Sequence, residues 1–195
     1  MSETSLSLLA RVRQPQDRAA WERLAELYTP MLRQWLRAYD VQDADADDLI
    51  QEVLSVVMRE VPQFDHNQRS GAFRTWLRGV LVNRLRNFWR GRQNRPIATG
   101  ESSMVERLNA LEDATSAASR QWESQHDTEL VARILELIRP NYAPQTWAAF
   151  HRQVIAGVPA PQVALELNMS LSSVYVARSR ILSALRRESA GIVDT

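Results

Sequence analysis

The stretch VPAPQVALELNMSLSSVYVARSRI, residues 158–181, has the pattern of two helices joined by a tight turn. The first helix is expected at about 160–168 and the second at about 171–188, because their apolar residues recur three and four positions apart. Asn168 lies between them and tolerates the left-handed backbone that such a turn requires. Ser170 or Ser172 can cap the second helix. The stretch therefore predicts a helix-turn-helix, and a plain helical hairpin is the alternative.

The second helix of this motif has a polar side that suits DNA. Its apolar side carries Val174, Ala177, Ile181 and Leu185. Small residues let a helix enter the major groove, where arginines reach phosphates and base edges. We therefore predict that duplex DNA is contacted by the outer face, which consists of Ser172, Ser173, Val176, Ser179, Arg180, Ser183 and Arg187.

The rest of the chain also has helical spacing. Helices are expected at about 5–13, at about 45–60 with Asp43 or Asp45 as the cap, and at about 72–92. A further helix begins at the capping residue Asp17 and contains Pro30, which can bend it. Strand-like alternation is scarce and there are only 6 glycines among 195 residues. The predicted fold class is all-α.

Residues 94–126 interrupt this pattern, because they are poor in apolar residues and rich in Ser, Ala and Glu. We interpret them as a linker with some helix near 104–111 and 114–122. The predicted organisation is two small helical domains joined by a linker: residues 1–95, an acidic linker at 96–128, and a helix-turn-helix domain at 129–195. From its composition, the linker can be a flexible tether that needs only length and solubility.

Charge is strongly segregated, although 24 basic and 23 acidic residues nearly cancel. Residues 40–65 hold eight acids and one arginine, residues 69–95 hold eight arginines and no acid, and residues 101–129 hold seven acids and two arginines. The last predicted helix adds Arg178, Arg180, Arg186 and Arg187, so two basic blocks lie around an acidic one and suggest two nucleic-acid surfaces. The alternative is that these blocks neutralise each other within one bundle.

Composition excludes several classes of site. The sequence has no cysteine and only three histidines, so disulfides and Cys-bearing zinc sites are excluded. No apolar run approaches the roughly 20 residues of a membrane helix, and the first residues lack a secretory signal. We expect a cytoplasmic protein with no metal site and no membrane contact.

Three blocks, in this order, carry a family resemblance. They are DADDLIQEV at residues 45–53, GAFRTWLR at 71–78 with VNRLRNFWR at 82–90, and VYVARSRIL at 174–182. The sequence resembles bacterial RNA polymerase sigma factors of the ECF (extracytoplasmic function) group. The resemblance implies a non-enzymatic protein, with no catalytic residue, cofactor or small-molecule substrate. Such a protein binds core RNA polymerase, recognises promoter DNA and promotes strand opening. Many relatives are held inactive by an anti-sigma protein.

The resemblance also gives roles to two groups of residues upstream of the helix-turn-helix. The acidic face that would dock on the clamp helices of the largest polymerase subunit consists of Asp47, Asp48, Gln51, Glu52 and Ser55. The alternatives for it are a solvated helix face and a metal-binding cluster. The residues that would recognise and melt the -10 promoter element are Phe64, His66, Asn67, Arg74, Arg78, Asn83, Arg86, Asn87, Trp89 and Arg90.

Some side chains in these helices are better explained by packing. Trp76 lies beside an apolar stripe and is expected in the core, whereas Trp89 lies on the polar face and can stack on a base. Arg84 and Arg178 interrupt apolar stripes, and a buried arginine needs a carboxylate partner. We expect Arg84 to pair with Asp48 or a nearby acid, and Arg178 to pair with Glu166.

Two other functions fit parts of the sequence. A stand-alone helix-turn-helix regulator would need a dimerisation helix or a ligand pocket, and the N-terminal half suggests neither. A metal-dependent nuclease could use the acids at 43–52, but the sequence shows no second ligand cluster and no general base.

Overall fold

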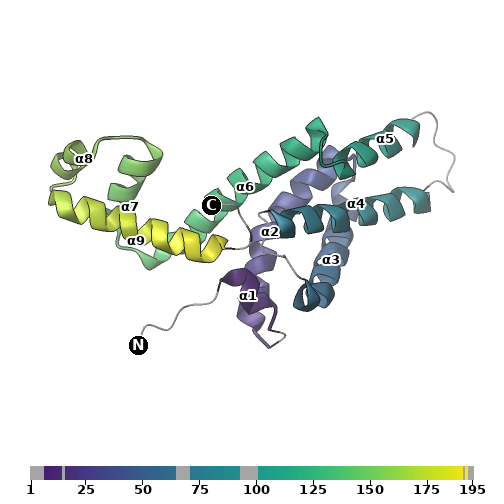
Figure 1. Cartoon of the computed structure of the whole chain (residues 1–195), viewed down its shortest axis with the longest axis horizontal. Helices are drawn as coiled ribbons and strands as arrows, with labels where there is room; N and C mark the ends of the chain where they lie inside the picture. Colours follow the sequence, from purple (N-terminus) through teal and green to yellow (C-terminus); the bar gives the residue numbers. More distant parts are fainter. Residues whose placement is uncertain (1–6, 15, 65–70, 93–100, 191, 193–195) are drawn as a thin grey trace.

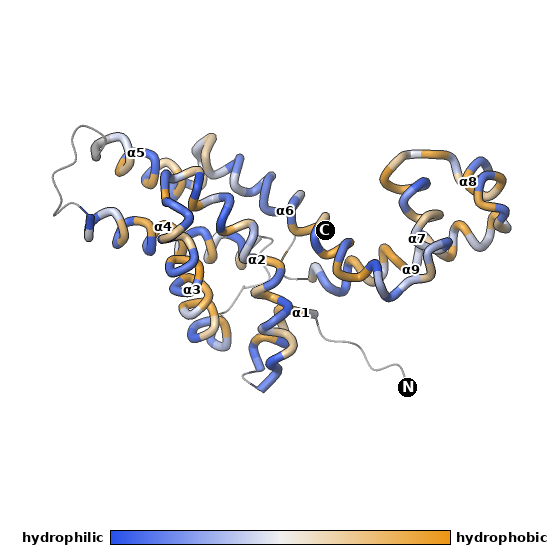
Figure 2. Tube along the Cα trace, turned by 180° about the vertical axis from the view of Figure 1, so that it is seen from behind, coloured by the Kyte–Doolittle hydropathy of each residue, from blue (hydrophilic) through white to orange (hydrophobic). Residues whose placement is uncertain are grey.

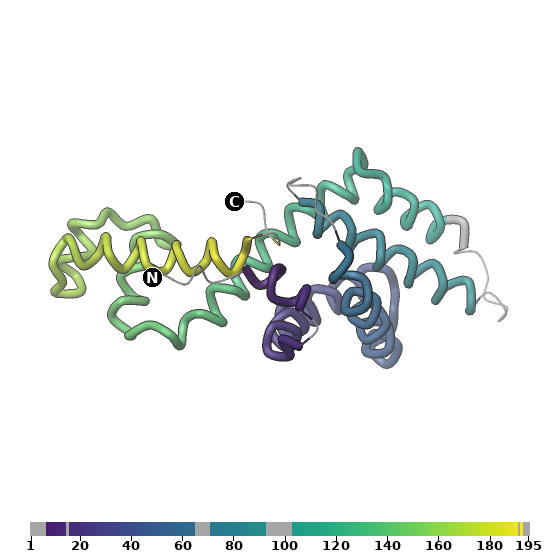
Figure 3. Tube along the Cα trace, turned by 60° about the horizontal axis from the view of Figure 1, so that its bottom comes forward, coloured from purple at the N-terminus to yellow at the C-terminus, as the bar shows by residue number. Residues whose placement is uncertain are grey.

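The computed structural model describes residues 7–14, 16–64, 71–92, 101–190 and 192. These residues form helices and turns, with no strand among them, which confirms the all-α prediction. The molecule is elongated: α1 to α5 lie toward one end, α7 and α8 lie at the other, and α6 runs between the two parts (Figures 1 and 3).

The first four helices form a bundle in which α2 packs on α3 and α3 packs on α4. Their bounds are α1 Leu8–Val12, α2 Arg18–Ala38, α3 Asp43–Glu60 and α4 Ala72–Arg92. The fourth helix has the predicted bounds, and α2 continues through Pro30. A 3-10 turn at Val61–Gln63 follows α3. Hydrophilic and hydrophobic residues are interspersed along these helices, as amphipathic packing requires (Figure 2).

The caps agree with the predictions at α2 and differ at α3. The Asp17 carboxylate accepts a hydrogen bond from the Ala20 amide at 2.9 Å. At α3 the capping position is Gln42, whose side chain makes no capping bond, so neither Asp43 nor Asp45 is the cap. Both acids lie in the first turn instead, where the helix dipole favours negative charge.

Residues 101–128 contain helix near 104–111 and 114–122 as expected, and these helices are longer than predicted and pack on the bundle. They form α5 (Glu101–Glu112) and the first half of α6 (Ala117–Ile138). Helix α5 packs on α4, and α6 packs on α5 and α2. Leu108, Leu111 and Trp122 are fully buried in the same core as the N-terminal bundle. A few large apolar side chains at helical spacing therefore anchor a stretch whose average composition is polar.

The last part contains the predicted helix pair. A 3-10 turn at Arg139–Asn141 leads to α7 (Pro144–Phe150), and a π-helical turn at His151–Ile155 leads to α8 (Ala160–Glu166) and α9 (Leu171–Ser189). Asn168 has a φ of 49° in the turn between α8 and α9. The Ser170 hydroxyl accepts from the Ser173 amide at 3.1 Å and caps α9.

Two apolar clusters hold the described residues together. The larger one runs through α1 to α6 and includes Ile181 and Ala184 of α9 together with Ile192. The smaller one lies among α7, α8 and the first half of α9, and consists of Ala149, Ala160, Val163, Val174 and Ala177. Because α6 also packs on α9, this helix joins the N-terminal bundle to the helix pair.

Candidate polymerase and nucleic-acid interfaces

Helix α3 presents a polar face to solvent and an apolar face to the bundle. The exposed residues include all five that were predicted to bind polymerase: Asp47, Asp48, Gln51, Glu52 and Ser55. Met58, three positions after Ser55, is 53% exposed on the same helix and was missed by the sequence reasoning. Its spacing from Ser55 was the signal that could have identified it.

Arginines from neighbouring helices border this acidic face. Arg33 of α2 forms an ion pair with Asp47. Nη1 of Arg84 lies 3.9 Å from Oε2 of Glu52, so the acid beside Arg84 is Glu52 and not Asp48. Hydrogen bonds from Arg37 lower the pKa of the Asp43 carboxyl at the start of the helix. Asp48 and Gln51 remain exposed beside these pairs.

The outer side of α4 carries exposed polar residues at helical spacing. Asn83, Asn87 and Arg90 are exposed, at positions i, i+4 and i+7. Arg86 is half-buried, because its Nη2 donates to Oδ1 of Asn109 at 2.8 Å and to Oε2 of Glu112 at 2.6 Å. The hydrogen bond that Arg86 donates to Glu112 lowers the pKa of the Glu112 carboxyl.

Arg74 and Arg78 do not lie on the exposed side of α4, contrary to the expected polar face. They are only 8% and 3% exposed, because α6 covers them. Nη1 of Arg74 donates to Oδ2 of Asp127 at 2.5 Å. Arg78 donates to the Ser119 hydroxyl and lies 3.5 Å from Oε1 of Glu123. Burial lowers the pKa of the Arg78 guanidinium.

A buried polar chain joins α2, α6 and α4. The Tyr28 hydroxyl lies 3.3 Å from Nε2 of His126, and Nδ1 of His126 lies 2.9 Å from Oδ1 of Asp127, which also accepts from Arg74. Burial opposes ionisation of Asp127, but the hydrogen bonds from His126 and Arg74 outweigh it and lower the pKa of this carboxyl. Sequence reasoning missed His126 and Asp127, although His126 lies four positions after the buried Trp122.

The aromatic residues around α4 pack against one another. Phe64 lies 4.9 Å from Trp76 and 5.8 Å from Phe73 between ring centroids, and Trp76 packs against the core as predicted. Trp89 is half-buried against Phe88, with ring centroids 5.1 Å apart. His66 and Asn67 lie outside the described residues.

Helix α9 exposes every residue that was predicted to contact duplex DNA: Ser172, Ser173, Val176, Ser179, Arg180, Ser183 and Arg187. Tyr175, beside Val176, is 49% exposed and was missed. Its position among the outer residues near the start of α9 could have identified it from the sequence. This exposed face consists of small side chains and two arginines, so it is basic.

The expected pair between Arg178 and Glu166 is not formed. Glu166 accepts from Nε and Nη2 of Arg152, at 2.9 and 2.6 Å, and these bonds lower the pKa of its carboxyl. Arg178 is exposed. It lies at the edge of the apolar side of α9, where a long side chain reaches solvent.

Within the described ranges, no group of His, Asp or Glu side chains could hold a metal ion. None of the helices that the structure describes is long and apolar enough to cross a membrane.

Comparison with known proteins gives the same family for both parts of the chain. Residues 24–95, which contain most of α2 with α3 and α4, match the family model for sigma-70 region 2. The RNA polymerase sigma factor CnrH of Cupriavidus metallidurans is 27% identical over 177 residues, which is 87% of each chain. The RNA polymerase sigma factor NccH of Alcaligenes xylosoxydans xylosoxydans is 28% identical over 189 residues, 93% of this chain and 94% of that relative.

The region 2 match covers the helices that carry the acidic and arginine-rich faces, and the two relatives extend the similarity through α9. A region 2 bundle followed by a helix pair with an exposed basic face is an arrangement suited to binding polymerase and promoter DNA. These similarities support an RNA polymerase sigma factor of the ECF group with a function in transcription initiation.

Proposed function

We propose that three surfaces share the work of this sigma factor. The acidic face of α3 docks on the clamp helices of the largest subunit of core polymerase. The outer side of α4 contacts the -10 element, and the outer face of α9 reads the -35 element. The observation that carries this proposal is the exposure of all five predicted residues on α3 and all seven on α9.

Docking through α3 follows from its charge and shape. Asp48 and Glu52 present carboxylates to solvent on a helix that is anchored to the bundle by its opposite side. Complementary charge speeds association and selects a basic partner. Met58 adds an exposed apolar side chain that a partner can bury.

Strand contact through α4 follows from the chemistry of its outer residues. Arg90 can neutralise phosphate, and the amides of Asn83 and Asn87 can hydrogen-bond the edges of unpaired bases. His66 and Asn67 belong to the connection that precedes α4, and Trp89 supplies an aromatic ring near its end. We assign Arg74, Arg78 and Arg86 to the same strand contact after they are released from α6 and α5.

Duplex reading through α9 follows from its small residues. The serines let the helix lie deep in the major groove, where Arg180 can make a bidentate contact to guanine. Val176 can pack on a thymine methyl group. In this proposal residues 1–95 and 129–195 act as the two functional domains, without catalysis of their own, in the cytoplasm.

Reversing charge on α3 tests the proposal. The variant Asp48→Arg with Glu52→Arg should fail to co-purify with core polymerase and should give no run-off transcript. Glu22→Arg, at an exposed site on α2, is the matched control and should behave like the wild-type chain. Far-UV circular dichroism verifies that each variant folds. Unchanged co-purification of the double variant would remove the docking role from α3.

A further inference from the structure

We infer that the start of α9 selects thymine within the -35 element, through apolar contact with the methyl group of that base. The contacting surface, called the apolar tip here, consists of Leu171, Tyr175 and Val176. This inference rests on the proposed function, in which α9 reads duplex DNA. It adds Leu171 and Tyr175 to the contact proposed for Val176, and it names the base that this end of the helix selects.

The apolar tip is exposed, unlike most large apolar side chains of this fold. Leu171, Tyr175 and Val176 are 43%, 49% and 47% exposed, and all three lie within residues 171–176. Every other aromatic side chain in the described part of the chain is buried or half-buried. Grouped apolar side chains in solvent, bordered by polar ones, mark interaction sites, so we expect a partner outside the chain to cover the tip.

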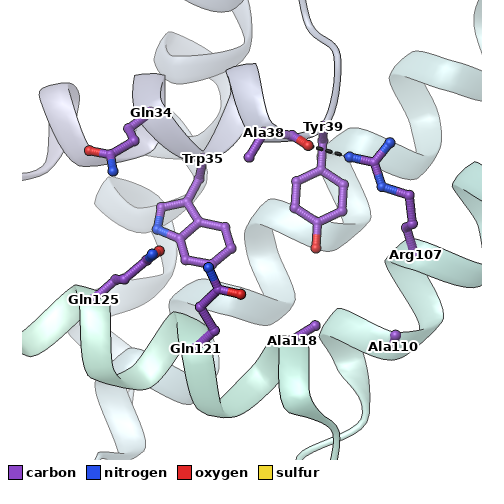
Figure 4. Close-up of a pocket in the computed structure, with 9 residues that line it drawn as sticks. All are labelled: Gln34, Trp35, Ala38, Tyr39, Arg107, Ala110, Ala118, Gln121 and Gln125. Carbon is purple, nitrogen blue, oxygen red and sulfur yellow. Dashed lines mark hydrogen bonds between the residues drawn. The ribbon is translucent and has the colours of Figure 1, made fainter.

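The bundle covers its aromatic rings even where it leaves a pocket. Trp35 and Tyr39 line a pocket of about 340 Å³ between α2, α5 and α6, yet both are buried (Figure 4). Arg107 of α5 lies over the Tyr39 ring, 5.1 Å from its centroid. A ring that is left half in solvent, as that of Tyr175 is, is therefore an exception in this fold and calls for a functional reason.

The fold directs the tip away from the protein. Val174 and Ala177, from the same turns, are buried in the small cluster with α7 and α8. At about 100° of rotation per residue, Tyr175 and Val176 project away from that buried side, and Leu171 lies one turn before Tyr175. The side-chain cap at the start of α9 and the packing of α9 on α7 and α8 hold the tip on a fixed backbone.

Duplex DNA is the partner that fits this position. The first residues of the second helix in a helix-turn-helix contact base edges in the major groove. Val176 belongs to the face proposed to contact DNA, and all four arginines of α9 follow the tip, at positions 178, 180, 186 and 187. Apolar side chains at the start of the helix and positive charge along the rest match base edges flanked by phosphates.

Thymine is selected because its methyl group is the apolar feature that a base pair presents in the major groove. Contact between this methyl group and the tip removes apolar surface of both partners from water. Cytosine presents an amino group instead, which would lose water without gaining an acceptor from an apolar side chain. Arg180 lies about one turn after Val176, so the guanine contact proposed for Arg180 falls on a different base pair.

Deoxyuridine tests the inference, because its base differs from thymine only by the missing methyl group. The probes are duplexes of a -35 element that the wild-type chain recognises together with core polymerase, with each thymidine replaced in turn by deoxyuridine. Binding is measured with core polymerase at one fixed salt concentration. We expect replacement at one or two positions to weaken binding by about three- to fivefold each, which is the worth of one buried methyl group.

The triple variant Leu171→Ser, Tyr175→Ser, Val176→Ser should bind the unmodified element about tenfold more weakly and should no longer distinguish thymidine from deoxyuridine. Serine is used because the methyl group of alanine could still contact thymine. Ile155→Ser is the matched control, since Ile155 is an exposed apolar residue of the C-terminal part outside α9. This control should keep both the affinity and the sensitivity to deoxyuridine. Far-UV circular dichroism verifies that each variant folds.

Each adverse result has a distinct meaning. Equal binding of the wild-type chain to every deoxyuridine probe, or unchanged sensitivity of the triple variant, would overturn the selection of thymine by the tip. A triple variant that binds all probes like the wild type but gives no run-off transcript would show that the tip docks on a protein, which also overturns the inference. A wild-type chain that prefers no -35 duplex over a scrambled sequence would instead overturn the proposed function.

Discussion

Arg78 and Arg90 share one helix, yet Arg78 is 3% exposed and Arg90 faces solvent. The side chain is the same in both, so its role depends on which neighbour covers it. Arg78 meets the fully buried Ser119 and the half-buried Glu123 of α6. A buried hydroxyl that loses its partner destabilises the fold, whereas an exposed arginine can be removed at little cost.

Replacing Arg78 with alanine should therefore lower the free energy of unfolding by about 2 kcal/mol, because the Ser119 hydroxyl is left unpaired beside a cavity. Urea denaturation of the purified protein measures this. Arg90→Ala is the control and should change stability by less than about 0.5 kcal/mol. Equal stability of the two variants would contradict the structural role of Arg78.

Arg180 belongs to the outer face of α9, and Arg178 lies toward the other side of the same helix. Arg180→Ala should weaken binding of the polymerase complex to a -35 duplex by about 1–3 kcal/mol, the usual worth of a bidentate base contact. Binding is measured at one fixed salt concentration, because phosphate contacts depend on salt. Arg178→Ala is the matched control. If it weakens binding as much as Arg180→Ala does, α9 has a different orientation in the groove.

Helix α6 shows how a sequence of polar average composition can form a helix with one buried side. Its buried positions Trp122, His126, Leu130, Ile134 and Ile138 recur every four residues. The polar member of this series, His126, is tied into the chain from Tyr28 to Asp127. Hydropathy alone therefore conceals the stripe, since the bundle supplies hydrogen-bond partners for the residues that do not look apolar.

Acid should loosen the contact between α6 and α4. The folded state lowers the pKa of Asp127, so its stabilising contribution is complete above the ordinary carboxyl pKa of about 4 and is lost as pH falls through the lower folded-state pKa. Asp127→Asn should therefore be less stable than the wild type at pH 7, by about 1 kcal/mol, and the difference should shrink below pH about 4.

Denaturation curves from pH 7 down to pH about 3 measure this difference. The exposed residue Asp48 provides the control, since Asp48→Asn should match the wild type across the range. A stability difference for Asp127→Asn that stays constant down to the lowest pH would show that the carboxylate charge does not hold α6 in place.

Stability is distributed unevenly between the N-terminal bundle and the C-terminal helix pair. The cluster of α1 to α6 contains tryptophan, tyrosine and many leucines, whereas the cluster of α7 to α9 consists of three alanines and two valines. Buried apolar area sets the gain from packing, so the helix pair is held by much less. The C-terminal part should open locally while the bundle stays folded.

Hydrogen exchange checks this distribution. Amides of α8 and of the first half of α9 should exchange faster than those of α2, α3 and the middle of α4, as followed by mass spectrometry at neutral pH. Uniform protection along the chain would mean that the large cluster stabilises both parts as a single cooperative unit.

Prediction from the sequence succeeded where the information is local. The bounds of α4 agree because the apolar spacing of 72–92 persists along the whole helix, and the Ser170 cap lies next to the helix it starts. Prediction failed where partners are distant in sequence. Glu166 binds Arg152 and not Arg178, and Asp127 binds Arg74, 53 residues away.

Local sequence patterns predict that this protein is helical, that α3 and α9 carry polar outer faces, and that its motifs resemble those of a sigma factor. Periodicity and capping decide the helices and their outer faces, and both act between near neighbours, whereas the family comes from the resemblance of three sequence blocks. Which arginines of α4 meet solvent is seen only in the folded chain, because it depends on where α6 packs. Such packing is fixed by burial and charge pairing between residues far apart in the chain, which no local pattern encodes.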